Sequence, residues 1–361
     1  MGKVCTDATL QGILNVLLEE NTYLQSIGQS ERFELSDIQT MKDISDAGTA
    51  RQFFKIGDQI VIDYTDTDGN THEMPWDIVH IGDATLADDT IKHDAVYLQS
   101  HYATVESIQY DHQENEKATE ATAQEGVYYY VPDGTDSNGY NVYKLLEIAA
   151  GETIDYTANP IVYHSAIKDP SGYIVRYGYN RESHSAIRQW LNSSAVKGQW
   201  WTAQHVGDVA PIQLNTVNGF MAGLPEAFTN CMKNLKITRA LNTISEPDKN
   251  IISESYNAKI FLPSIEQMYI EPQTTAGLEG EAWDYYKQLA IGIGLSGPFQ
   301  QLQTYHILTS YTMNTQSMAQ YVRTSSASSD YSCYVWTVIS RGYVNGVNAS
   351  GTVTCRPACV I

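Results

Sequence analysis

The sequence has little positive charge. Lysine and arginine together number 22, against 42 aspartate and glutamate residues in a chain of 361, and the formal net charge is −20. A protein that binds DNA or RNA needs clustered basic residues to neutralise phosphates, and here the basic residues are scattered. The same deficit disfavours an anionic membrane surface. We therefore expect no nucleic-acid partner.

Long hydrophobic runs are also lacking. The apolar run at residues 13–18 is interrupted by Asn15, and no segment reaches the length of a membrane span or reads as a signal peptide. We expect a chain that is made and folded in a cytoplasm, with no membrane span.

Cysteines are few: 5, 231, 333, 355 and 359. Because the number is odd and most are far apart, we expect free buried thiols rather than a disulfide framework. No histidine or second cysteine pair accompanies Cys355 and Cys359, so no zinc site is complete. We expect no metal and no cofactor.

Catalytic motifs lack their structural context. Residues 292–297 match G-x-G-x-x-G, but the match follows a helical stretch and opens no helix, as dinucleotide binding would require. The nine histidines stand singly. A carboxylate pair for glycoside hydrolysis stays open, because acidic residues abound and the sequence does not single out a pair. We expect a protein that is not an enzyme.

Tyrosine, in contrast, is abundant, with 25 residues against 7 phenylalanines. This ratio fits half-exposed aromatic surface, because the phenol seeks a polar partner, and strand propensity explains it equally well.

Helices are expected at the N-terminus and strands beyond it. Residues 7–27 read as an amphipathic helix, either a short coiled-coil seam or a helix packed on its own domain. Ser36 and Asp37 can cap a second helix that runs to Ile44. From Phe53 the pattern becomes strands, with a hairpin turn at 65–70; Pro75 stands where a calcium loop needs glutamate.

The central part of the chain reads as an insertion followed by a mixed domain. Two strands, 127–131 and 140–146, flank a turn at 132–134. Further on, Ser183 or Ser185 can cap a helix that ends near Asn192, Pro225 begins another helix, and 259–263 reads as a buried strand. The expected fold is α+β in four parts: a helical attachment and oligomerisation segment (1–50), the β-hairpin start of the core domain (51–104), a β-hairpin insertion (105–162) and a mixed α/β domain (163–361).

The tail, residues 333–361, reads as three short strands joined by Gly and Asn turns. It closes on apolar residues, so we expect the end to be held in a sheet rather than frayed. Polar and aromatic side chains between the turns offer adaptable contacts, which predicts a binding face.

Several motifs together resemble an uncharacterised domain family of tailed bacteriophages and of gut bacteria that carry prophages. They are Ser185–Asn192, Trp200–Thr202, Gly219–Gly223, Lys259–Leu262 and Arg356–Ile361, with Phe53–Asp58 and Trp76–Val79 matching its phage-encoded members.

The resemblance implies a C-type-lectin-like C-terminal half, similar to phage tropism determinants and to proteins diversified by retroelements. The Trp-Leu-Arg-Ser stretch of the family corresponds here to 305–311, without its Trp and Arg. The ligand-binding positions implied are Tyr311, Asn314, Trp336, Arg341, Tyr343, Asn345, Asn348 and Ser350.

We therefore expect a virion surface protein, in a tail or on the capsid, that is made in the host cytoplasm and binds a host-surface glycan or protein through its C-terminal sheet. Residues 1–50 would contact other virion proteins, and a homo-oligomer, a trimer above other states, would multiply weak binding. The alternatives are a structural decoration or collar protein and, third, a glycosidase or an oxidase of the formylglycine-generating type.

Overall fold

The computed structural model describes residues 30–241, 252–271, 278–292, 294–299, 320–325, 332–338 and 344–361. Within these ranges the fold is α+β, with several sheets and few, short helices. The helix expected at 7–27 lies outside the described residues. Among the described helices, none has the length and apolar content of a membrane span.

The largest sheet has six strands. Their spatial order is β1 (Arg32–Glu34), β2 (Gln59–Thr65), β3 (Thr71–Thr85), β4 (Ile91–Ser100), β16 (Ala358–Val360) and β11 (Ile260–Phe261). Only β1 and β2 run parallel; the other neighbours in this sheet are antiparallel. The last strand of the chain therefore lies between strands from its second and third quarters.

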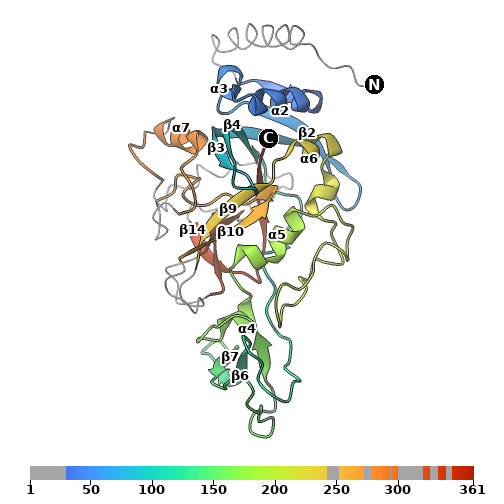
Figure 1. Cartoon of the computed structure of the whole chain (residues 1–361), viewed down its shortest axis with the longest axis vertical. Coiled ribbons are helices and arrows are strands. Elements are labelled where there is room, and N and C mark those ends of the chain that lie inside the picture. Colours follow the sequence, from blue (N-terminus) through green and yellow to red (C-terminus); the bar gives the residue numbers. More distant parts are fainter. Residues whose placement is uncertain are drawn as a thin grey trace.

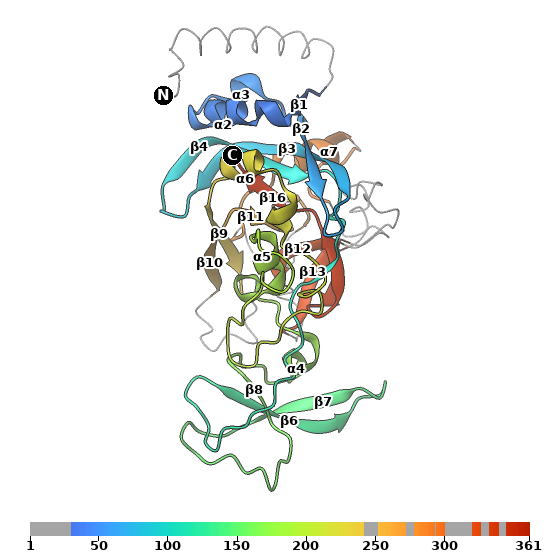
Figure 2. The same ribbon diagram turned by 90° about the vertical axis from the view of Figure 1, so that its right-hand side faces the viewer.

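The prediction that the chain end is held in a sheet is confirmed. Ile361 is fully buried, its N–H donates to the Val96 carbonyl at 3.1 Å, and its carbonyl accepts from Ser45 Oγ at 2.6 Å. Ser45 belongs to α2 (Ile38–Asp46), which with α3 (Ala50–Phe53) lies over one face of the sheet (Figure 2).

A second sheet of five strands lies beside a two-stranded ribbon. Its order is β14 (Val344–Asn348), β13 (Tyr334–Val338), β12 (Gln320–Ser325), β15 (Thr352–Cys355) and β5 (Ile108–Gln109). The ribbon pairs β9 (Leu235–Ala240) with β10 (Ser253–Ala258). The tail thus forms four strands, β13 to β16, where the sequence suggested three.

The insertion forms a small sheet at the end of the molecule opposite α2 and α3 (Figure 1). Its strands are β7 (Asn141–Leu146), β6 (Tyr128–Thr135) and β8 (Tyr163–Ser165). It has its own apolar core, which includes Tyr129, Val131 and Val162. We call this part the protruding sheet.

The remaining helices are short. They are α4 (Tyr173–Tyr177), α5 (Ala186–Leu191), α6 (Glu226–Cys231), α7 (Asp284–Gly292) and the 3-10 turns at Leu35–Asp37, Glu182–His184 and Phe220–Gly223. Pro225 is the N-cap of α6, as its sequence position predicted.

Two of the sequence-based boundaries are wrong, and the reasons are local. The strand expected from Phe53 is β2, which begins only at Gln59 because residues 50–53 form α3. In the insertion, Pro132 lies inside β6 and the turn falls at 136–140.

The two hairpin turns are held by the same pattern of hydrogen bonds, in which an aspartate side chain accepts two backbone N–H groups. Asp66 accepts the N–H of residues 68 and 70, and Asp136 accepts the N–H of residues 138 and 140, all at 2.8–3.0 Å. The third turn residue, Gly69 or Gly139, adopts a positive φ of 85° or 80°. This is the three-residue hairpin loop that ends in a left-handed residue. The turn expected at 65–70 is confirmed.

The six-stranded sheet is buried on both faces around β16. Along β16, Cys359 and Ile361 pack into one apolar core with α5 and α6, whereas Ala358 and Val360 pack into a second core with α7 and β9. The second core lies under the site described next.

Asn192, just after α5, fixes β11 beside that core. Its Oδ1 accepts from the backbone N–H of Lys259 and Ile260 at 2.9 and 3.0 Å, and its Nδ2 donates to the Ile260 carbonyl at 2.8 Å. The side chain thus supplies the bonds that a further strand would make.

Candidate functional site

The structure describes four of the eight residues that the resemblance assigned to ligand binding. Tyr311, Asn314, Arg341 and Tyr343 lie outside the described residues. Of the other four, Asn345 is exposed, while Asn348 and Ser350 are half-buried. The backbone of Ser350 is engaged in contacts: its N–H donates to Tyr177 and its carbonyl accepts from Gln109 Nε2.

Trp336 is buried, contrary to the expectation of an exposed aromatic side chain. Its side chain is 9% exposed and packs in the second core, on the same strand face as Val338. Val335, on the opposite face of β13, packs in the first core. A central strand that is covered on both faces has no solvent-facing side, so Trp336 does not lie on an exposed face of β13.

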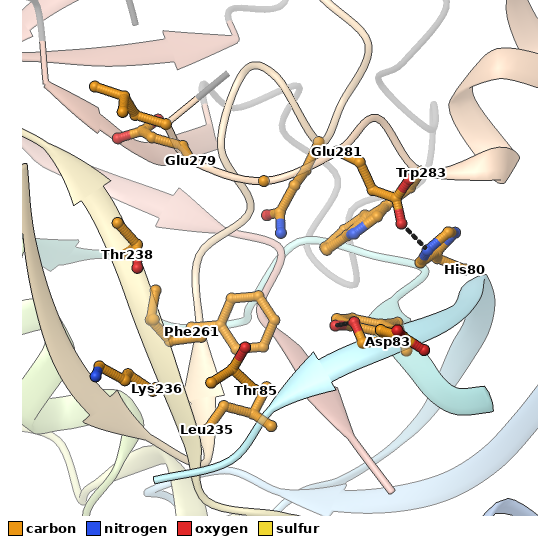
Figure 3. A pocket seen from close by; sticks show the side chains of 15 residues that line it. His80, Asp83, Thr85, Leu235, Lys236, Thr238, Phe261, Glu279, Glu281 and Trp283 are labelled. Carbon is orange, nitrogen blue, oxygen red and sulfur yellow. Dashed lines mark hydrogen bonds and ion pairs between the residues drawn. The ribbon is translucent and has the colours of Figure 1, made fainter. Parts of the chain in front are cut away.

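The structure instead shows a pocket of about 280 Å³ beside the second core (Figure 3). The ends of β3 and β9, residues of β4 and β11, and the loop before α7 surround it. Its polar lining residues are His80, Asp83, Thr85, Lys236, Thr238, Gln267, Glu279 and Glu281. Its apolar lining includes Tyr97, Leu235, Ile237, Phe261, Leu278 and Trp283.

His80 is fixed between two carboxylates at one side of the pocket. Its Nε2 lies 3.1 Å from Glu281 Oε1 and its Nδ1 lies 3.1 Å from Asp284 Oδ2, while the side chain is 4% exposed. Neutral imidazole carries one N–H, so only the imidazolium form donates to both carboxylates at once. The histidine thereby ties β3 to the loop before α7.

Gly82 leaves room for this histidine. A Cβ at position 82 would overlap Nε2 of His80, the atom that faces Glu281. Any larger residue there must displace the ring or the strand.

Aromatic rings form the floor of the pocket. Trp283 is 1% exposed, and its ring centroid lies 6.0 Å from that of Tyr97 and 6.4 Å from that of Phe261. The Tyr97 hydroxyl donates to the Asp83 carbonyl at 2.7 Å. The floor is therefore closely packed and apolar, and its one hydroxyl is bonded to the backbone of Asp83.

The charge at the rim is negative. The side chains of Asp83 and Glu281 are 65% and 68% exposed, and Glu279 is buried with Oε1 accepting the Ala240 N–H at 2.9 Å. Lys236 is the lining lysine, and its Nζ pairs with Asp89 outside the pocket at 2.5 Å. Asp83 in turn contacts His93, and Glu281 contacts His80. The lining is negative overall because it holds three carboxylates and one lysine.

Metal-ligating groups and the thiols of the tail are the other features that could carry chemistry. In the described part of the chain, no group of three His, Cys, Asp or Glu side chains could hold a metal ion. Cys333, Cys355 and Cys359 are buried, and burial raises the pKa of each thiol, that of Cys355 to about 12. A reactive cysteine needs the opposite, an accessible thiol with a lowered pKa.

A second polar cluster lies where the protruding sheet joins the main body. We call Asp111, Glu114, His205 and Asp208 the junction cluster. Glu114 is fully buried, Asp111 is 2% exposed, and His205 Nε2 lies 3.7 Å from Glu114 Oε1. Burial raises the pKa of Asp111 and of Glu114 well above their usual ranges, and the other carboxylates of the cluster add to the rise.

Sequence reasoning missed the pocket. Its lining residues come from three stretches, 80–97, 235–267 and 278–283, which no local spacing connects. The available hint was the acidic pair Glu279 and Glu281 just before a tryptophan, in a loop that leads into a helix.

Comparison with curated proteins and with solved structures gave no match. Comparison with protein families gave one: residues 167–361 match the family described as "Domain of unknown function (DUF6273)". The matched region holds β9, β11, α7 and the tail strands, and it covers more than half of the chain. This protein belongs to the DUF6273 family.

Proposed function

We propose that this chain is a bacteriophage virion surface protein that recognises a host-surface glycan or protein. The site would be the pocket beside the second core, not the face of β13. We also propose a C-type-lectin-like arrangement for residues 163–361. The resemblance to phage-encoded proteins supports the virion location, and the family match over 167–361 supports treating that half as one unit.

One observation carries the recognition role: a preformed pocket with an aromatic floor and polar groups that converge on it. A concave site that combines apolar walls with fixed polar side chains is the usual form of a small-ligand site, and in this one the polar groups make up most of the lining. The histidine is held at both ring nitrogens, and the aromatic rings are stacked. Because these side chains are already ordered, binding a ligand costs less conformational entropy.

The test is binding of the labelled full-length chain to cells of the bacterial strain that the parent phage infects. Thr85→Trp at the end of β3 fills the pocket from its rim. Thr71→Trp places the same side chain at the exposed start of the same strand and serves as the matched control. We expect Thr85→Trp to abolish cell binding and Thr71→Trp to leave it unchanged.

Equal cell binding by both variants would exclude the pocket as the recognition site. The structural decoration role would then be the better explanation, and it predicts that the chain attaches to virions with either tryptophan in place.

A further inference from the structure

The polar groups at the rim of the pocket are mostly hydrogen-bond acceptors. Asp83 and Glu281 present carboxylates from opposite sides, and Gln267, Thr85 and Thr238 add an amide and two hydroxyls. Carboxylates accept hydroxyl hydrogen bonds strongly, because bonds to an ionised acceptor are about twice as strong as neutral ones. The complementary ligand carries several hydroxyl donors close together.

The aromatic floor sets the shape of that ligand. Trp283, Tyr97 and Phe261 are buried and inclined to one another, so they close the bottom of the pocket with apolar atoms rather than with one exposed ring face. Apolar atoms at the bottom suit a ligand with C–H groups on one side. A ligand with hydroxyls at its edge and C–H groups on its face is a sugar ring.

The size of the pocket limits the ligand to a single ring. Its volume of about 280 Å³ is just below the range for small-ligand sites, about 300–1,000 Å³. A terminal sugar fits such a volume, whereas a chain of several sugars would have to lie outside it.

The charge of the rim excludes acidic sugars. Three carboxylates and one lysine line the pocket. Lys236 pairs with Asp89, Asp83 with His93 and Glu281 with His80, so the carboxylates remain in excess. A carboxylate on the ligand would be repelled by these carboxylates and would gain no positively charged partner in return. One like-charge contact at about 4 Å in water costs roughly fivefold in affinity.

We infer that the pocket binds one terminal pyranose ring that is neutral or carries an amino group, and that it rejects uronic acids and other anionic sugars. This inference rests on the proposed recognition function and specifies its ligand.

The experiment uses three methyl glycosides: a neutral hexose, the amino sugar in which one hydroxyl is replaced by an amine, and the uronate in which the CH2OH group is replaced by a carboxylate. They are titrated in the gluco, galacto and manno series into the full-length chain, with binding followed by NMR. We expect the uronate to bind at least about fivefold more weakly than its neutral counterpart. We expect Asp83→Asn and Glu281→Gln each to reduce the difference in affinity between the neutral sugar and the uronate, and to weaken binding of the amino sugar.

The outcomes separate this inference from the proposed function. Tightest binding by a uronate, or a preference that both variants leave unchanged, overturns the inference. If no glycoside binds although Thr85→Trp abolishes cell binding, the ligand is not a sugar and the recognition role stands. If the glycosides bind as expected but Thr85→Trp leaves cell binding intact, the ligand class is retained and the recognition role fails.

Discussion

At the scale of single residues, Asp46 illustrates how a few charges hold the edge of the fold. Its carboxylate contacts Lys42 at 2.6 Å, Lys92 at 2.9 Å and Lys233 at 2.6 Å, which join α2 to β4 and to the segment after α6. Burial alone would raise the pKa of this carboxyl, but hydrogen bonds from the three lysines outweigh it and hold the pKa well below its usual range.

We predict that Asp46→Asn lowers the free energy of unfolding by about 1 kcal/mol at pH 7, a value that allows for solvent screening of a partly exposed group. Because the pKa is depressed in the folded state, the contribution is present above about pH 4 and is lost as the pH falls further. Urea unfolding at pH 7 and pH 2 checks this, with Asp43→Asn on the same helix as the control. A difference that does not shrink between pH 7 and pH 2 would contradict the prediction.

Gly82 acts on the pocket through one neighbour. We predict that Gly82→Ala destabilises the protein by about 1–3 kcal/mol, because the added methyl group overlaps the His80 ring. The cost should fall when His80 is itself replaced by alanine, and urea unfolding of the double-mutant cycle measures this coupling.

Gly346 is the matched control for Gly82. It also lies in a strand, and a Cβ there would meet only ordinary contacts with Tyr334. An undiminished cost of Gly82→Ala in the His80→Ala background would place the clash elsewhere.

At the scale of elements, α5 shows how the structure resolves an open choice of cap. The sequence allowed Ser183 or Ser185. Ser185 is the N-cap, and its Oγ accepts the Arg188 N–H at 3.3 Å and donates to the Glu182 carbonyl at 2.8 Å. Ser183 instead donates to Glu254 at 2.8 Å.

Ser185→Ala should therefore lower the free energy of unfolding by about 1–2 kcal/mol, the usual cost of a lost N-cap. Ser185 is 1% exposed, so water cannot replace the lost bonds. Ser183→Ala is the comparison variant, and chemical denaturation of both proteins is the measurement. A larger loss for Ser183→Ala would mean that the contact with Glu254 matters more than the cap.

At the scale of the whole molecule, the junction cluster links the protruding sheet to the main body. The pKa of its Glu114 is raised, whereas the pKa of Asp46 is lowered. The pKa of Glu114 is raised by burial, against a hydrogen bond from Ser165, and the carboxylates of Asp208 and Asp169 add to the rise. A carboxyl whose folded-state pKa is raised stabilises the fold below about pH 4 and loses that contribution as the pH rises through the folded value.

We predict that Glu114→Gln makes the protein more stable than the native sequence at pH 8, by about 1–3 kcal/mol, and changes little at pH 4. The amide keeps the size of the side chain and cannot ionise. Urea unfolding from pH 4 to pH 8 is the measurement, with the exposed Asp63→Asn as the control. Parallel pH profiles for Glu114→Gln and the native sequence would show that the junction does not titrate in this range.

Local patterns in the sequence were enough to predict several elements. The turn at 65–70, the helix through residue 44, the cap by Pro225 and the buried chain end each follow from a few neighbouring residues. The same local reasoning misplaced the turn in the insertion, because Pro132–Gly134 looks like a turn whereas Asp136 and Gly139 supply the required bonds and positive φ.

The sequence by itself determined the α+β class, because alternation, caps and turns depend on contacts within a few residues. Only the tertiary structure decided the site. The pocket gathers side chains up to about two hundred positions apart through long-range strand pairing, and β13 is buried because other elements cover both of its faces. Which face of a strand meets solvent is a property of its neighbours in space, and no local pattern records them.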